Sequence, residues 1–157
     1  MSLNHYISDP IPVPTPDDAE DGTDFSRADL EFYGVDHSGS SFEARVFFDN
    51  PDADETTPRQ EDSGYVGSFY IFGHGGCFGD IGHCDIPAEP NGPFDRRPPH
   101  PLTPQKRTVV VTEAIKQFRE TAGGDLTVTV VPVASESPID AEDELFSFER
   151  LALITYD

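Results

Sequence analysis

The stretch Phe42-Glu43-Ala44-Arg45-Val46-Phe47-Phe48 decides the fold. Its even-numbered residues are all apolar, whereas Glu43 and Arg45 between them are charged. A period of two is typical of a β-strand with one face in a core and the other in water. We therefore predict a half-buried strand here.

The preceding segment, Ala28 to Val35, has the same character, because Leu30 and Phe32 alternate with acidic residues. A serine and glycine turn, Asp36 to Ser41, separates the two predicted strands. We expect the two strands to form an antiparallel hairpin through this turn.

A third predicted strand follows an acidic loop that runs from Asn50 to Ser63. The residues from Tyr65 to Phe72 are apolar or aromatic at both parities. This pattern predicts a strand in the middle of a sheet that is packed from both sides.

The second half of the chain predicts a strand, a helix and a strand. Arg107 to Val111 is the first strand, and Thr112 then has the character of a helix N-cap. We predict a helix from Glu113 to Thr121 that ends at two glycines and buries one face. That face contains Ile115, Phe118 and Ala122. Leu126 to Val130 alternates again and predicts the next strand.

The last predicted strand is Leu145 to Tyr156. Phe146 and Phe148 share one parity, but the leucines after them have the other. We expect a β-bulge near Glu149 and Arg150 to reconcile the two.

These elements favour the mainly-β class, with an antiparallel β-sandwich of six to eight strands, Greek-key-like connections and one short α-helix. We expect a single domain over residues 26–157. Residues 1–25, rich in proline and acidic residues, predict a disordered leader.

The charge of the chain restricts its partners. Thirty acidic residues against ten basic ones give a net charge of -20. Nucleic acid and anionic membranes would be repelled, so neither is expected to bind. No apolar run is long enough to cross a membrane and no signal pattern is visible. We nevertheless expect a secreted or cell-envelope location.

The glycine-rich segment over residues 73–85 contains both cysteines and two of the five histidines. His74, Cys77, His83 and Cys84 have the spacing His-x2-Cys-x5-His-Cys. Thiolate and imidazole together suit copper, and less readily zinc. The sequence therefore predicts a metal site on a loop that continues the Tyr65–Phe72 strand.

Two other states of the same residues stay open. A disulfide between Cys77 and Cys84 would close a short loop, which the glycines permit. His74, His83 and His100 would then remain as an all-imidazole set for copper or zinc. Both cysteines could instead be free thiols. No serine or cysteine is singled out by a neighbouring base, so we assign no catalytic residue.

Several blocks of the chain together resemble the C-terminal domain that follows the catalytic domain of tyrosinase and polyphenol oxidase type proteins, which are binuclear copper oxidases. They span about Ala28 to Tyr156. The blocks are Phe42 to Phe47 with Asp49 to Pro51, Tyr65 to Phe69, Val109 to Ile115, Leu126 to Pro132 and Phe148 to Leu151.

The resemblance implies a β-sandwich that packs on a helical copper domain, covers its active-site entrance and assists folding or copper loading. The partner would be a tyrosinase-like catalytic domain, in the same chain or a separate one. The family's catalytic half has no counterpart here, because none of the five histidines forms a helix-spaced pair.

Three functions follow as hypotheses. The first is a non-catalytic accessory domain of a tyrosinase-like copper oxidase, with the segment from His74 to Cys84 facing the copper centre. The second is a small enzyme that holds one copper or zinc ion on the same loop with His100. The third is a structural module with bridged cysteines.

Overall fold

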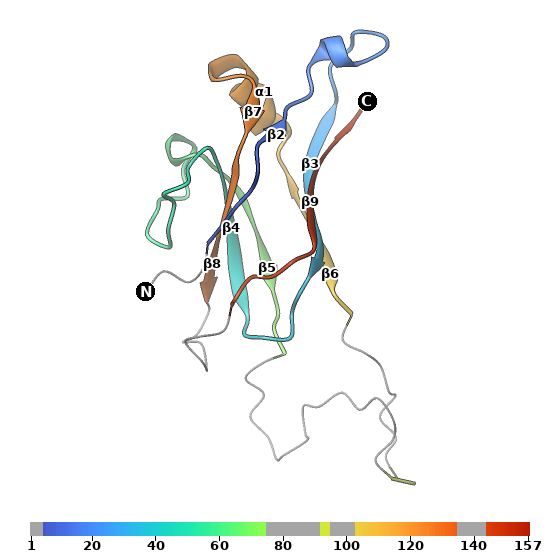
Figure 1. The fold of residues 1–157 in the computed structure, drawn as a ribbon, viewed down its shortest axis with the longest axis vertical. Helices are drawn as coiled ribbons and strands as arrows, with labels where there is room; N and C mark the ends of the chain where they lie inside the picture. The colour runs from blue at the N-terminus through green and yellow to red at the C-terminus, as the bar shows by residue number, and fades with distance from the viewer. Residues whose placement is uncertain (1–4, 75–91, 95–102, 135–143) are drawn as a thin grey trace.

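The structure, a computed structural model, describes residues 5–74, 92–94, 103–134 and 144–157. Within these residues two antiparallel sheets face each other (Figure 1). The first has the order β1 (Tyr6–Ile7), β8 (Val128–Ala134), β4 (Phe42–Phe48) and β5 (Tyr65–Ile71). The second has the order β6 (Gln105–Val110), β3 (Arg27–Val35) and β9 (Arg150–Tyr156).

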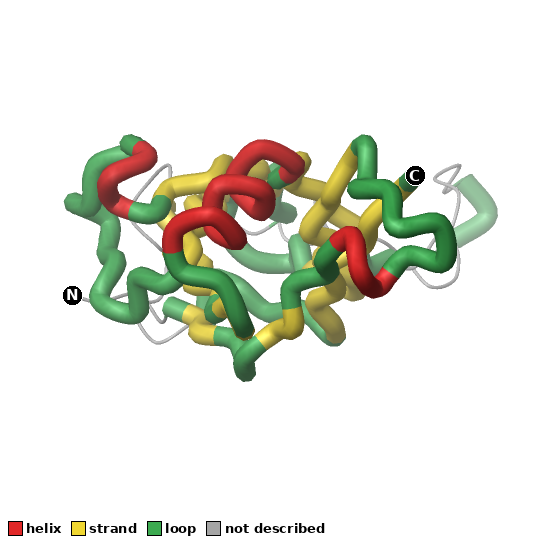
Figure 2. Tube along the Cα trace, turned by 90° about the horizontal axis from the view of Figure 1, so that it is seen from above, coloured by secondary structure: helices red, strands yellow, loops and turns green. Residues whose placement is uncertain are grey.

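Three helical segments and a short strand pair complete the described fold. The strands β2 (Ile11–Pro12) and β7 (Asp125–Leu126) pair with each other. The helices are α1 (Thr112–Thr121) and two 3-10 turns, η1 (Pro16–Asp18) and η2 (Glu61–Ser63). Figure 2, viewed from above, shows the helices at one end of the sheets. The predicted antiparallel sandwich with one α-helix is confirmed.

The core lies between the sheets and follows the predicted inner face of β4. The outer face, predicted to be in water, is largely buried as well, because Ala53 of the following loop packs on Phe47, which is 0% exposed. Phe42, Ala44 and Val46 of β4 are buried, as are Leu30 and Phe32 of β3. These side chains meet across the layers because each strand turns its apolar parity inward.

The predicted hairpin of the first two long strands is wrong. Strand β3 pairs with β6 and β9, whereas β4 pairs with β5 and β8. The connection Asp36 to Ser41 crosses from one sheet to the other. Alternation specifies which face of a strand is buried but not which strand lies beside it, so two such strands can also pack face to face.

The predicted central position of the Tyr65–Phe72 strand is also wrong, because β5 is an edge strand among the strands that the structure describes. Phe69 and Ile71 point into the core, but Tyr70 is 65% exposed and Phe72 is 81% exposed. Aromatic residues at both parities therefore indicate here a buried inner face and an outer face that is partly exposed to solvent.

The helix agrees with its prediction, except that Thr112 is its first residue and Val111 its N-cap. The Thr112 hydroxyl accepts a hydrogen bond from the Ala28 backbone N–H at 3.0 Å, which ties the helix to β3. Ile115 and Phe118 are buried as predicted, but Ala122, the third residue of the predicted buried face, is exposed because the helix ends at Thr121 and Ala122 is its C-cap.

The last strand begins only at Arg150, so the change of parity falls where the chain enters the sheet, and no bulge is needed within β9. Phe146 and Phe148 precede the strand and stack at 4.9 Å. The irregularity of this sheet lies instead in β3, between Phe32 and Val35, where Gly34 has a φ of 68°.

The prediction of a disordered leader over residues 1–25 is wrong for residues 5–25. Strand β1 pairs with β8, and Ile11 lies opposite Leu126. Phe25 is 6% exposed and belongs to the core. The apolar residues between the prolines are enough to hold this segment, because each proline lowers the entropy lost on ordering it.

Glu43 is a buried carboxylate on the outer face of the four-stranded sheet. It accepts hydrogen bonds from Ser68 at 2.8 Å and Arg45 at 3.1 Å, and Arg59 lies 2.9 Å away. Burial alone would raise the pKa of Glu43, but the hydrogen bonds from Ser68 and Arg45 and the two guanidinium charges outweigh it, so the pKa lies below its ordinary value.

Among the described residues, no helix combines the length and apolar character needed to cross a membrane.

Phe25→Ala should lower the free energy of unfolding by about 3 kcal/mol, because it removes a buried ring from the core. The exposed Phe72→Ala is the matched control and should change the free energy by less than about 0.5 kcal/mol. Denaturant unfolding measures both. Equal, small effects would show that the leader does not pack on the sandwich.

Glu43→Gln should destabilise the protein by about 1–2 kcal/mol at pH 7, because hydrogen bonds to a charged acceptor are lost. A lowered folded-state pKa gives stability that is present above the unfolded pKa of about 4.3 and is lost as the pH falls through the folded pKa. The two proteins should therefore converge in unfolding free energy in strong acid. If the difference in unfolding free energy between the two proteins did not change from pH 7 to pH 3, the lowered pKa of Glu43 would be contradicted. The exposed Glu61→Gln serves as the control.

Candidate functional site

Of the predicted metal ligands, only His74 falls within the described residues. Cys77, His83, Cys84 and His100 lie outside them, as does the alternative disulfide between Cys77 and Cys84. The described part of the site is its root, which consists of Gly73 and His74, where the chain leaves β5, and of Thr103 and Gln105, where it enters β6.

Gly73 holds the start of this segment close to the backbone of another. Its N–H donates to the Ser41 hydroxyl at 3.0 Å. A Cβ atom placed on Gly73 would come within 2.1 Å of the Gly39 carbonyl oxygen. Glycine is required here because no side chain fits between the two backbones.

His74 contacts His37 through both its backbone and its ring. Its N–H donates to the His37 carbonyl at 2.9 Å, and its Nδ1 lies 3.2 Å from the same oxygen. The two imidazole rings meet edge to face, with centroids 4.9 Å apart. Since a carbonyl only accepts, Nδ1 of His74 is the donor, and in the neutral form of the ring Nε2 has its lone pair available.

His37 is buried and both of its ring nitrogens are engaged. Nε2 lies 2.7 Å from the Thr103 carbonyl oxygen and so donates to it. Nδ1 then accepts from the Gln105 side-chain amide at 3.3 Å. His37, 6% exposed, thus joins the end of β5, through its backbone carbonyl, to the start of β6, through its imidazole.

No sequence signal singled out His37. It stands between Asp36 and Ser38, and the Ser38 N–H bonds to the Asp36 carboxylate as in an ordinary turn. Its role appears only when the crossing of Asp36 to Ser41 between the sheets brings the two strand ends together.

The described residues supply at most one ligand of the predicted metal site. They contain no group of three or more His, Cys, Asp or Glu residues that could hold an ion. His74 nevertheless fits the role, because metal-binding histidines usually donate the other ring N–H to a carbonyl or carboxylate. His37 does not fit, because ligation would break one of its two hydrogen bonds.

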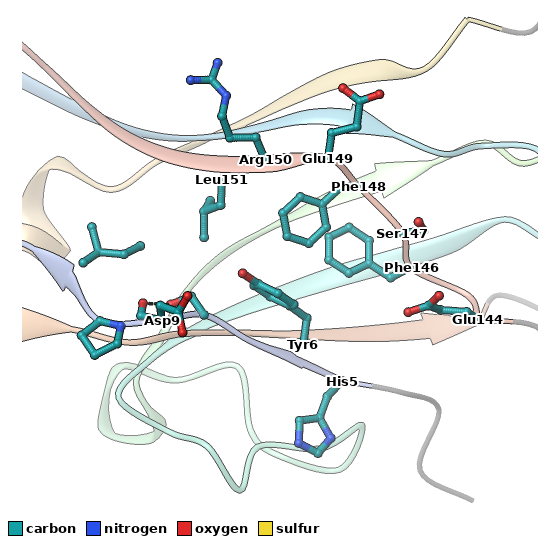
Figure 3. A pocket seen from close by; sticks show the side chains of 13 residues that line it. His5, Tyr6, Asp9, Glu144, Phe146, Ser147, Phe148, Glu149, Arg150 and Leu151 are labelled. Carbon is teal, nitrogen blue, oxygen red and sulfur yellow. Dashed lines mark hydrogen bonds between the residues drawn. The ribbon is translucent and has the colours of Figure 1, made fainter.

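A second feature is a cleft of about 410 Å³ between the N-terminal segment and the residues that lead into β9 (Figure 3). Tyr6 from one wall and Phe148 and Leu151 from the other point into it. Tyr6 and Phe148 meet edge to face with centroids 4.8 Å apart. The exposed acids Asp9 and Glu144 border the cleft.

Comparison with known proteins gives a similarity in structure alone. No protein-family model matches the chain, and no curated protein matches it by sequence. The fold is similar to a latent aurone synthase, a polyphenol oxidase, from its natural source, with a TM-score of 0.53, 15% identity, 99% of this chain covered and 24% of that one. The recombinantly expressed latent enzyme gives a TM-score of 0.54 at 17% identity, again over 99% of this chain and 24% of that one.

The fold of this chain is thus that of a part of polyphenol oxidases, and the expected β-sandwich of that resemblance is confirmed. The chain spans about a quarter of the length of these polyphenol oxidase chains. The similarity is one of fold.

The hydrogen bonds at the root predict two different tautomers. At pH 8, where imidazoles are ordinarily neutral, His74 should carry its proton on Nδ1 and His37 on Nε2. Long-range ¹H–¹⁵N correlation spectra distinguish the two forms, and solvent-exposed His5 gives the reference pattern. A His74 ring protonated on Nε2 would contradict its bond to the His37 carbonyl.

Proposed function

We propose that this chain is a non-catalytic accessory domain of a polyphenol-oxidase-like copper oxidase. The observation that carries the proposal is the match of 98–99% of this chain to only 24% of latent polyphenol oxidase chains. In the proposed role this domain covers the active site of the larger remainder or assists its copper loading.

The arrangement at the root of the 75–102 segment supports a role for that segment. His37 bonds to Thr103 at the start of β6 and to His74 after the end of β5. Between them, the backbone at Gly73 lies so close to that of Gly39 that it leaves no room for a side chain. His74 is therefore held in a fixed position at this end of the sandwich. In the proposed complex this end of the sandwich faces the copper centre.

The proposed copper ligands are His74 within the described part and Cys77, His83 and Cys84 beyond it, with His100 available from the same segment. Copper(I) is the ion that best suits mixed thiolate and imidazole ligands. Bound there, it would be passed to the partner's own histidines. No step of catalysis is assigned to this chain.

Titration of the reduced protein with copper(I) against a competing chelator tests copper handling. We expect one ion per chain and at least roughly a tenfold weaker affinity for Cys77→Ser, because a thiolate ligand is lost. His5→Ala is the control and should leave the affinity unchanged. Absence of binding, or an unchanged affinity in Cys77→Ser, would remove the loading role.

Elemental analysis of protein purified without added metal separates the proposal from an enzyme with a resident ion. An empty protein agrees with transient loading. A stoichiometric, tightly held copper or zinc ion would favour the mononuclear enzyme instead.

A further inference from the structure

We propose that the free edge of β9 and the cleft beside it bind an extended, basic peptide segment of a partner protein by adding a strand to the sheet. The inference concerns a different part of the molecule from the His74 segment and does not depend on copper handling.

The first observation is the edge itself. Strand β9 is last in its sheet, and β3 is its one partner among the described strands. Residues Leu151 to Thr155 are uncharged and contain no proline or glycine. Since a paired strand directs only alternate backbone groups to its neighbour, the others in β9 face away from β3 and can accept a new strand.

The other sheet edges are protected. On β5, the Tyr70 carbonyl accepts a hydrogen bond from Arg107 at 3.3 Å, and Gly67 interrupts the strand with a φ of 154°. The edge strand β6 carries Lys106 and Arg107. Strand β1 has two residues only. Charges, bulges and short length are the ordinary devices that prevent added pairing, and the stretch Leu151 to Thr155 of β9 lacks them.

The second observation is the cleft of about 410 Å³ that opens at the start of β9. Its lining includes Tyr6, Phe148 and Leu151, which Figure 3 shows pointing into the same space. A side chain from an added strand would find an apolar and aromatic surface there. Peptides that add to a sheet edge obtain affinity from backbone hydrogen bonds and specificity from such a recess.

The charges around the cleft select a basic occupant. Asp9 and Glu144 border it and are exposed. The one arginine of the lining, Arg150, lies over the ring of Tyr33 at 4.2 Å and points away from the cleft in Figure 3. Lysine or arginine at alternate positions of the peptide would therefore meet carboxylates without competition from the protein's own cations.

A second copy of this chain is a poorer occupant, because each copy carries a net charge of -20 and would repel the other. A partner segment that is acidic or neutral would likewise be a poorer occupant, because Asp9 and Glu144 would not attract it.

The test uses a fluorescein-labelled peptide of seven residues that alternates lysine and valine, and measures its anisotropy with the whole chain. Three comparisons define the mode of binding. The Asp9→Lys/Glu144→Lys variant should bind at least tenfold more weakly, whereas the Glu61→Lys/Asp62→Lys control, with the same change of charge on exposed η2, should bind nearly as the original protein does. A peptide with methylated backbone nitrogens at alternate positions should also bind at least tenfold more weakly. An alternating glutamate and valine peptide should not bind.

Amide hydrogen exchange locates the site. The peptide should protect alternate amides of β9, while the amides of β5 stay unchanged. The proposal is overturned if the peptide does not bind, if the methylated peptide binds equally well, or if the two charge variants lose the same affinity. It is also overturned if sedimentation shows that the chain forms a dimer and hydrogen exchange shows that the dimer protects β9.

Discussion

Phe32 makes the contact on which the rest of the structure depends. Its buried ring lies 5.0 Å from that of Phe69 in the facing sheet, and 5.7 Å and 6.1 Å from those of Phe148 and Phe146. Aromatic rings at such separations add to the free energy gained by burial. This cluster joins the two sheets and also anchors the segment that leads into β9.

The two sides of the sandwich differ, and both candidate sites follow from that difference. Where β5 approaches β6, a Cβ atom on Gly67 would come within 2.7 Å of Val109, so the sheets come close because that position has no side chain. His37 lies at the end of the same side and joins the two strand ends. On the opposite side β1 and β9 remain apart, and the cleft lies between them.

The sequence predicts the buried faces but not the arrangement of the strands. The alternation of Phe42 to Phe48 and the burial of Ile115 and Phe118 follow from periodicity alone, because each residue's parity fixes its side. The pairing of β3 with β9 joins residues that are more than 100 positions apart in the sequence, such as Arg27 and Tyr156. No local pattern encodes such a pairing. The ordered structure of residues 5–25 is not predictable for a similar reason, since Ile11 and Phe25 are isolated apolar residues among prolines and acids.

The candidate site is predicted only in part. Histidines and cysteines on glycines mark residues 73–85, but His37 is set in an ordinary turn, and its bonds to Thr103 and Gln105 depend on three segments meeting. The cleft likewise depends on the pairing of β1 with β8, which the proline-rich sequence of residues 1–25 does not predict. Sites built from distant segments become visible only in the folded chain.

The proposed accessory role rests on a fold similar to that of about a quarter of a latent polyphenol oxidase chain, together with the hydrogen bonds that hold His74 at the end of β5. The most direct measurement is the rate of diphenol oxidation by a polyphenol-oxidase-type catalytic domain, with and without this chain bound or fused to it. The account predicts that the rate falls at least roughly tenfold in the complex and recovers after selective proteolysis of this chain. A complex that forms but oxidises diphenols as fast as the catalytic domain alone would contradict it.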